Sequence, residues 1–183
     1  MNRIDALFGR LKSEGRCALM PFITAGDPDL ETTGALIAAM TAKGADMVEI
    51  GIPYSDPIAD GPVITASYNR ALNRGVKLAQ IFAALAEARS RDGVTPLVAM
   101  VSYAIIHKHG VDAFLNHSAQ AGVDGLIIPD LPVEEAEVVG GKAAKLDLKM
   151  IHLITPTTPR ERAIKIAKAT TGFIYFVSVA GLT

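Results

Sequence analysis

Residues 47–65 are the part of the sequence from which the fold prediction starts. They begin Met47-Val48-Glu49-Ile50-Gly51-Ile52 and continue Pro53-Tyr54-Ser55-Asp56-Pro57-Ile58-Ala59-Asp60-Gly61-Pro62. The first six residues predict a short buried strand that contains the carboxylate of Glu49. Burying a charged side chain in such a strand is unfavourable unless the charge is paired or used in chemistry. Two more acids, Asp56 and Asp60, follow in a loop stiffened by prolines. The stretch therefore predicts a site at the carboxyl end of this strand.

Apolar runs alternate with helical patterns on both sides of this stretch. The other predicted strands are residues 17–24, 96–102, 125–129, 150–155 and 172–178. Helical spacing predicts helices at residues 3–14, 77–91, 107–121, 133–145 and 160–168, with a further segment near 63–72. One more helix is expected to be capped by Asp27, with Pro28 in its first turn, and to end at Lys43-Gly44. The continuous apolar strands indicate a parallel sheet that is covered on both faces.

Two α/β folds have such alternation, the doubly wound sheet and the (β/α)8 barrel. A doubly wound nucleotide-binding sheet carries a glycine-rich turn after its first strand, and this chain has Thr24-Ala25-Gly26-Asp27-Pro28 there. Polar residues follow the carboxyl ends of many strands, which is how a barrel builds its site. The sequence therefore predicts a single domain, residues 1–183, of the TIM-barrel type. Eight units commonly need about 250 residues, so we expect six units here and the two C-terminal units to be absent.

Bulk properties exclude several classes of function. The net charge is −1 and no basic run is present, so nucleic-acid and anionic-membrane binding have no support. The single cysteine, Cys17, excludes an internal disulfide and a cysteine-based zinc site, and we expect it to be a buried or half-buried filler. No apolar run is long enough to span a membrane, and the N-terminus lacks the apolar core of a signal peptide. These features predict a cytoplasmic protein.

No metal site is predicted. His107 and His109, with His117 further on, suggest a chelating cluster, but residues two apart do not share a helix face. His152, in the fifth strand, is expected to point outward beneath a helix. The strands also lack a lysine at their carboxyl ends, which disfavours a Schiff-base aldolase.

The chain resembles a known family, the α subunits of tryptophan synthase. The densest similarity is Glu49-Ile50-Gly51-Ile52-Pro53-Tyr54-Ser55-Asp56-Pro57 with Ala59-Asp60-Gly61-Pro62. Three further segments support it in order, Pro21-Phe22-Ile23-Thr24-Ala25-Gly26-Asp27-Pro28, Gly125-Leu126-Ile127-Ile128-Pro129-Asp130-Leu131-Pro132 and Ser178-Val179-Ala180-Gly181-Leu182-Thr183. The similarity extends over the whole chain.

The resemblance implies a (β/α)8 barrel that cleaves indole-3-glycerol phosphate to indole and glyceraldehyde 3-phosphate in tryptophan biosynthesis. It implies no cofactor for this chain, because pyridoxal phosphate (PLP) belongs to the partner β subunit of an αββα heterotetramer. It also implies a continuation past residue 183, through two strands whose loops hold the substrate phosphate. An alternative remains at this point: a barrel fragment with little activity that acts mainly by binding the β subunit.

The resemblance also assigns roles to residues. Glu49 is the acid/base that protonates the indole ring carbon and accepts the hydroxyl proton, a task that needs a pKa raised toward neutrality by burial. Asp60 accepts the indole N–H as positive charge develops on the ring. Tyr175 and the lid residue Thr183 match family residues at the substrate, and Phe22 and Ile127 are expected, by their positions, to form an apolar wall for the indole ring.

Each assignment has a structural alternative. Glu49 could be paired with a structural Lys or Arg, and Asp60 could cap the helix that begins near Pro62. Tyr175 and Phe22 could be ordinary core residues. Asp27 and Asp130 are expected to be caps or turn residues, and Asp56 a loop or partner-contact residue.

Overall fold

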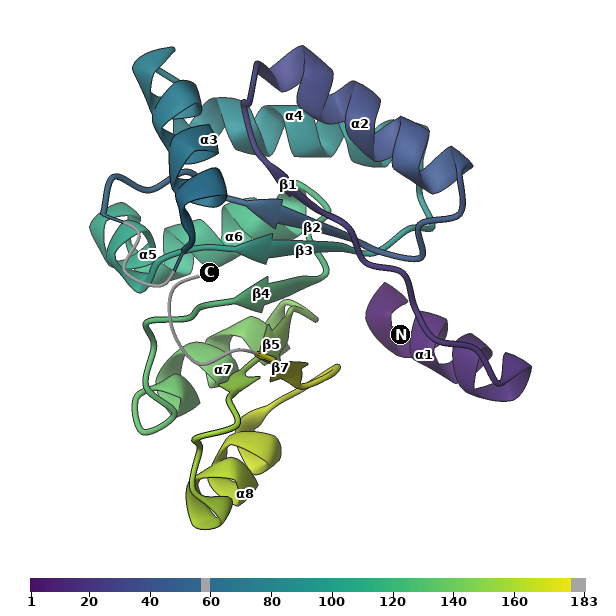
Figure 1. Cartoon of the computed structure of the whole chain (residues 1–183), viewed down its shortest axis with the longest axis vertical. Helices are drawn as coiled ribbons and strands as arrows, with labels where there is room; N and C mark the ends of the chain where they lie inside the picture. The colour runs from purple at the N-terminus through teal and green to yellow at the C-terminus, as the bar shows by residue number, and fades with distance from the viewer. Residues whose placement is uncertain (57–59, 179–183) are drawn as a thin grey trace.

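The computed structural model describes residues 1–56 and 60–178 and shows an α/β fold (Figure 1). Its helices are α1 (Arg3–Glu14), α2 (Leu30–Ala42), α3 (Pro62–Asn73), α4 (Leu78–Arg91), α5 (Tyr103–His109), α6 (Val111–Gln120), α7 (Ala136–Lys145) and α8 (Arg160–Ala169). Its strands are β1 (Phe22–Thr24), β2 (Val48–Gly51), β3 (Leu97–Met100), β4 (Gly125–Ile127), β5 (Lys149–Ile151), β6 (Leu153–Ile154) and β7 (Tyr175–Phe176). No described helix is long and apolar enough to cross a membrane.

The strands pair in chain order. Strands β1 to β5 form one parallel sheet in the order β1-β2-β3-β4-β5, and β6 pairs in parallel with β7. Only His152 separates β5 from β6, and its carbonyl accepts a hydrogen bond from the Tyr175 amide at 3.0 Å. The β6–β7 pair therefore continues the order in which β1 to β5 follow one another. A doubly wound sheet reverses its strand order at a switch point, whereas a barrel does not, so the predicted barrel-type fold is confirmed.

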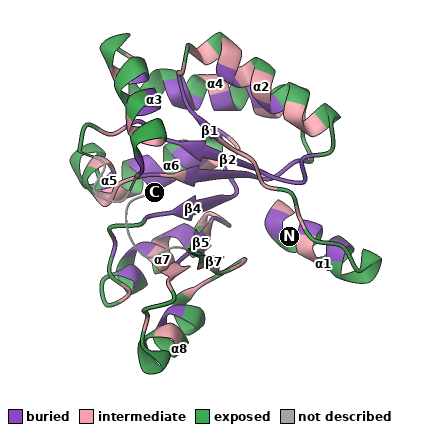
Figure 2. Cartoon of the chain, viewed as in Figure 1, coloured by how far each residue is buried: buried purple, intermediate pink, exposed green. Residues whose placement is uncertain are grey.

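The two faces of the sheet bury different cores. Ile50, Ala99 and Leu126 belong to a core cluster that also includes residues of α2, α4, α6 and α7. Val98 and Ile127 belong to a second cluster, on the face that is inside the curve of a barrel. Figure 2 shows the central strands, such as β2 and β4, as buried, whereas β6 and β7 are less buried. The central strands are mainly apolar because both of their faces are covered.

Helix α1 packs on the inner face, at the amino ends of the strands. Its Ile4, Leu7 and Leu11 are buried at helical spacing, and they share the inner cluster with Met47 and Ile151. Because this end of the inner face is filled by apolar side chains, the carboxyl ends of the strands are left for a site.

Several local predictions were wrong. Helix α2 is capped by Asp29, whose side chain accepts from the Thr32 amide, whereas Asp27 forms an ion pair with Arg70. The helix predicted at 107–121 is two helices, because Gly110 has a φ of 89° and interrupts it.

The structure also shows where the side chains of Cys17 and His152 lie. Cys17 is exposed and is no core filler. His152 lies on the outer face, opposite to Ile151, and is buried, and burial lowers its pKa. The strands are also shorter than the apolar runs from which they were predicted, because the hydrogen-bonded pairing between strands covers only part of each run.

Candidate active site

Glu49 lies in the middle of β2 on the inner face, at the same level as Phe22 of β1 and Val98 of β3. It is 2% exposed, and its Oε1 has no hydrogen-bond partner among the described residues. Burial raises the pKa of its carboxyl to about 7, and the Asp60 carboxylate contributes to that rise. No ion pair with Glu49 occurs in the described chain, so the structural-pair alternative is wrong there. A carboxyl with this pKa can both give and accept a proton near neutral pH.

Asp60 lies just before α3, beyond the carboxyl end of β2. Burial raises the pKa of its carboxyl. The residue at the N-cap of α3 is Gly61, and no side chain caps that helix; Asp60 contributes only its carbonyl, which accepts from the Thr65 hydroxyl at 3.4 Å. The capping alternative is therefore wrong, and the Asp60 carboxylate is available to a ligand.

A cavity of about 200 Å³ opens at the carboxyl ends of β2, β3 and β4. Its lining consists of Ile52, Tyr54, Asp56, Asp60, Tyr68, Met100, Val101, Ser102, Pro129 and Asp130. On its far side, Asp130 accepts hydrogen bonds from the Ser102 hydroxyl and the Tyr103 amide, both at 2.7 Å. Asp130 thus holds the start of α5, which is the structural role that we expected.

Phe22 meets the acidic stretch at Gly51. A Cβ atom built on Gly51 would collide with the ring of Phe22 and would lie 2.9 Å from the hydroxyl of Tyr68. Gly51 follows Glu49 by two residues, so it shares the inner face of the strand. Phe22 therefore stands beside the catalytic candidate, and only a glycine at position 51 leaves room for it.

Tyr175 reaches the same site from β7. Its side chain is half-buried, and its pKa is raised by burial and by the nearby Glu49 carboxylate. It also packs against the inner core cluster, so Tyr175 both contributes to the core and lies near Glu49. The structure thus brings together Glu49, Asp60, Phe22 and Tyr175 from separate parts of the chain.

The other two predicted contacts differ. Ile127 is fully buried on the inner face and, like Glu49, Phe22 and Tyr175, is not among the residues that line the cavity. Its contact with substrate stays a prediction. Thr183 lies outside the described residues, so its predicted role also stays a prediction.

Sequence reasoning missed Tyr68. Its place on α3 gave no signal, because an aromatic residue in a helix following a loop is most often core. It is 3% exposed, yet it lines the cavity together with Asp60. A hydrogen bond of 2.6 Å between the hydroxyls of Thr24 and Ser67 fixes this part of α3 against β1.

The described residues contain no group of three or more His, Cys, Asp and Glu side chains that could hold a metal ion. His109 and His117 do approach one another, with Nε2 and Nδ1 3.0 Å apart, from neighbouring helices. Sequence spacing could not show this contact, because it follows from the break at Gly110.

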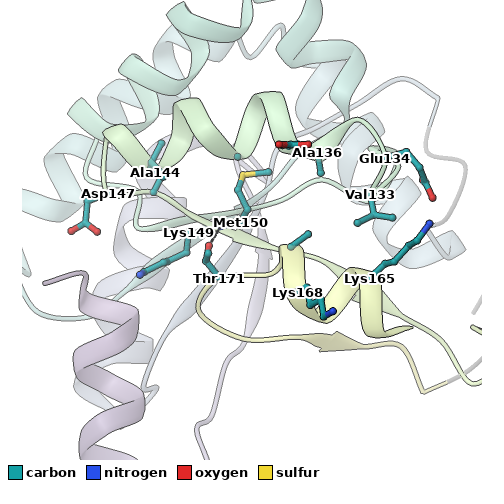
Figure 3. Close-up of a pocket in the computed structure, with 14 residues that line it drawn as sticks. Val133, Glu134, Ala136, Ala144, Asp147, Lys149, Met150, Lys165, Lys168 and Thr171 are labelled. Atoms are coloured by element: carbon teal, nitrogen blue, oxygen red, sulfur yellow. Dashed lines mark hydrogen bonds between the residues drawn. The ribbon is translucent and has the colours of Figure 1, made fainter. Parts of the chain in front are cut away.

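A second cavity, of about 620 Å³, lies between α7 and α8, above Met150 and Thr171 (Figure 3). Its rim mixes the lysines Lys165 and Lys168 with the acid Glu134. Glu134 is paired with Arg162 of α8 at 3.0 Å. None of the predicted site residues lines this cavity, so it is separate from the site of Glu49 and Asp60.

The chain is similar to proteins of one family. Residues 8–183 match the family model described as tryptophan synthase alpha chain. The tryptophan synthase alpha chains of Picosynechococcus sp. and Thermoanaerobacter pseudethanolicus are 49% and 50% identical to this chain, which is covered completely and spans 69% of each relative.

Solved structures are similar as well. The crystal structure of tryptophan synthase subunit alpha from Legionella pneumophila has a TM-score of 0.94 at 40% identity, over 97% of this chain and 68% of that one. A structure of the tryptophan synthase complex from Pyrococcus furiosus has a TM-score of 0.83 at 41% identity, over 87% of this chain and 65% of that one.

Proposed function

The chain belongs to the tryptophan synthase alpha chain family, and on that premise we propose that it cleaves indole-3-glycerol phosphate to indole and glyceraldehyde 3-phosphate. This is a carbon–carbon lyase reaction of the retro-aldol type, and it would be the contribution of this α subunit to tryptophan biosynthesis. The observation that carries the proposal is the pair of acids: Glu49 is buried with no partner for its Oε1 among the described residues, burial raises its pKa to about 7, and Asp60 lies close enough to add to that rise.

Two proton transfers at Glu49 account for the bond cleavage. Glu49 first delivers its proton to the indole ring carbon that carries the side chain, which turns the ring into a leaving group. As a carboxylate it then takes the proton of the adjacent side-chain hydroxyl. The oxygen electrons form the aldehyde carbonyl, and the electrons of the breaking carbon–carbon bond return to the ring as indole leaves. One group can serve both steps because its pKa lies near the working pH.

Asp60 acts at the other end of the ring. Protonating the ring carbon places positive charge on the indole nitrogen, and the carboxylate of Asp60 accepts the N–H and stabilises that charge. Phe22 and Tyr175 support this arrangement, because both lie beside Glu49 on the inner face. We also propose Ile127 and Thr183 as substrate contacts.

We further propose a β subunit as partner, in an αββα assembly. One related solved structure, 41% identical to this chain, concerns the mutual activation of the a2b2 complex of Pyrococcus furiosus tryptophan synthase. The chemistry above needs only carboxyl groups, so we propose that this chain has no cofactor of its own and that pyridoxal phosphate acts in the β subunit.

Glutamine at position 49 tests the proposed function. Glu49→Gln keeps the shape and removes the titrating group, so cleavage of indole-3-glycerol phosphate should fall by about 10²- to 10⁴-fold. The matched control is Glu31→Gln, which changes an exposed glutamate of α2 and should leave turnover unchanged. Turnover by Glu49→Gln at the level of the control would refute the proposal. Absence of cleavage by the unaltered chain, with β-subunit binding retained in a sedimentation assay, would favour the binding-module alternative.

A further inference from the structure

The phenol of Tyr68 is the feature of the site that the proposed mechanism does not use. Tyr68 is 3% exposed, and it lines the cavity beside Asp60. Its hydroxyl oxygen lies 2.9 Å from the position of a Cβ on Gly51, which places it on the inner face. No acceptor for this hydroxyl is found among the residues that the structure describes. A buried hydroxyl that faces a cavity is expected to find a hydrogen-bond partner there.

Glu49 lacks a hydrogen-bond donor, as Tyr68 lacks an acceptor, among the described residues. Its Oε1 is buried without a donor in the described chain. Glu49 and Gly51 lie on the same face of β2, and the Tyr68 hydroxyl lies at Gly51, so the phenol shares the inner face with Glu49 and is nearer the carboxyl end of the strand. Because Gly51 has no side chain, nothing on the strand separates the glutamate from the phenol.

The position of Tyr68 is also fixed. The neighbouring residue, Ser67, is bonded to Thr24 of β1 at 2.6 Å and to the Ile64 carbonyl at 2.7 Å. The α3 helix therefore cannot rotate Tyr68 away from the inner face without breaking a buried contact. Rigid support of this kind is what a positioning group needs.

We propose that Tyr68 is a positioning residue that donates its O–H to the Glu49 carboxylate when Glu49 has given up its proton. The proposal rests on the proposed function, in which Glu49 alternates between acid and base. A donor that binds only the ionised form stabilises that form, so it lowers the pKa from the value that burial alone would impose. Tyr68 would thereby let Glu49 release its proton to the ring carbon near neutral pH, while the phenol itself stays protonated and transfers nothing.

Other titratable groups face the same space. Asp60 and Asp56 come from the loop after β2, Tyr54 from the same loop, Tyr175 from β7 and Asp130 from the far side of the cavity. Of these, Asp60 is the rival acceptor for the phenol. Burial raises the pKa of Tyr68, and both Asp60 and Glu49 add to that rise, so both carboxylates are close to it. The test must therefore read the two acids separately.

Tyr68→Phe removes the hydroxyl and keeps the ring. In ¹³C NMR titrations of side-chain carboxyls, carried out on the protein without substrate, the pKa of Glu49 should rise by about one pH unit or more above the unaltered protein. The alkaline limb of the pH profile of kcat/KM for cleavage, where activity falls as free Glu49 loses the proton that it must deliver, should move in the same direction. The matched control is Tyr103→Phe, which removes a phenol of α5 outside the lining of the cavity and should leave both readouts in place.

A rise confined to Asp60, or no change in either carboxyl, would overturn the proposal. If Tyr68→Phe does not fold, 3-fluorotyrosine at position 68 serves instead, because it is a stronger donor of nearly the same shape and should lower the pKa of Glu49. An unchanged pKa in that protein would also overturn the proposal. The titration needs no turnover, so a Glu49 shift without any cleavage would refute the proposed function alone, and cleavage without a Glu49 shift would refute the role of Tyr68 alone.

Discussion

Two buried acids lie three residues apart, Asp46 just before β2 and Glu49 within it, and they behave in opposite ways. Asp46 precedes β2 and accepts two hydrogen bonds from the Arg16 guanidinium, at 2.7 and 2.8 Å, and one from the Leu19 amide. The Arg16 side chain holds the pKa of Asp46 down at about 2. Glu49 has no such partner in the part of the chain that the structure describes, and burial raises its pKa to about 7.

The difference teaches that burial alone does not mark a catalytic acid. Asp124, at the start of β4, is also almost completely buried, and it is paired with Arg3 and Arg89. At the amino ends of the strands the acids are satisfied and hold the barrel together. Toward the carboxyl end of β2, the buried Glu49 Oε1 has no hydrogen-bond partner among the described residues, and a buried acid in that state is a candidate for catalysis. Breaking each acid separately should therefore give effects of different size and sign.

The largest effect on stability is expected at Asp124. Its carboxylate accepts from Arg89 Nη2, from Arg3 Nη1 and from the Leu97 amide, all within 2.9 Å. Asp124→Asn leaves Arg89 partly buried without its counter-charge, so urea denaturation should show a loss of about 3–5 kcal/mol. Asp112→Asn is the control, because Asp112 forms an exposed pair with Lys142 and should change stability by less than about 1 kcal/mol. Equal losses in the two variants would contradict this contrast.

The next effect should have the opposite sign and depend on pH. Glu49 has a folded pKa of about 7 and an ordinary value of 4.5, so its contribution to stability is fully present below 4.5 and is lost as the pH rises through 7. The difference between those two pKa values corresponds to about 3 kcal/mol. Glu49→Gln, which cannot ionise, should therefore match the unaltered protein at pH 4.5 and exceed its stability by up to about 3 kcal/mol at pH 8.5. Urea denaturation at both pH values measures this, and a pH-independent difference would contradict the assignment.

Asp46 should show a smaller effect with the reverse dependence on pH. Its folded pKa of about 2 lies below its ordinary 3.8, so its stabilisation is present above 3.8 and is lost as the pH falls through 2. Because Arg16 is half-exposed, we expect Asp46→Asn to lower stability by about 1–2 kcal/mol at pH 6. The deficit should shrink toward zero near pH 2. A deficit that persists unchanged at low pH would mean that packing, and not charge, is responsible.

The smallest effect on stability is expected at Asp27. Asp27 lies beyond the carboxyl end of β1, yet it is paired with Arg70, whose side chain is 59% exposed. Asp27→Asn should reduce stability by less than about 1 kcal/mol, and high salt should abolish most of the difference. A large loss, measured by thermal unfolding at low and high salt, would show that this pair is more than a surface contact.

The fold was predictable because it depends on patterns that repeat along the chain. Continuous apolar strands that alternate with helical spacing indicated a parallel sheet with covered faces, and the polar residues at the carboxyl ends favoured a barrel. Local details failed where short-range rules compete. Asp27 and Asp29 are both capping residue types, and only Asp29 accepts from the helix. A glycine inside a helical pattern is often tolerated, but Gly110 has a positive φ and divides the helix.

The burial of Glu49 was predictable from the sequence by itself, and its role as a functional acid stays a prediction, which rests on the cost of burying an isolated carboxylate in an apolar strand. The acidic loop with Asp60 and the order of the strands also followed from local sequence. The tertiary structure alone decided that Arg16 satisfies Asp46 while Glu49 has no described partner. It also decided that Tyr68 and Phe22 meet over Gly51. The physical reason is that these contacts join residues distant in sequence, whose approach is fixed by strand register and helix packing and has no local signal.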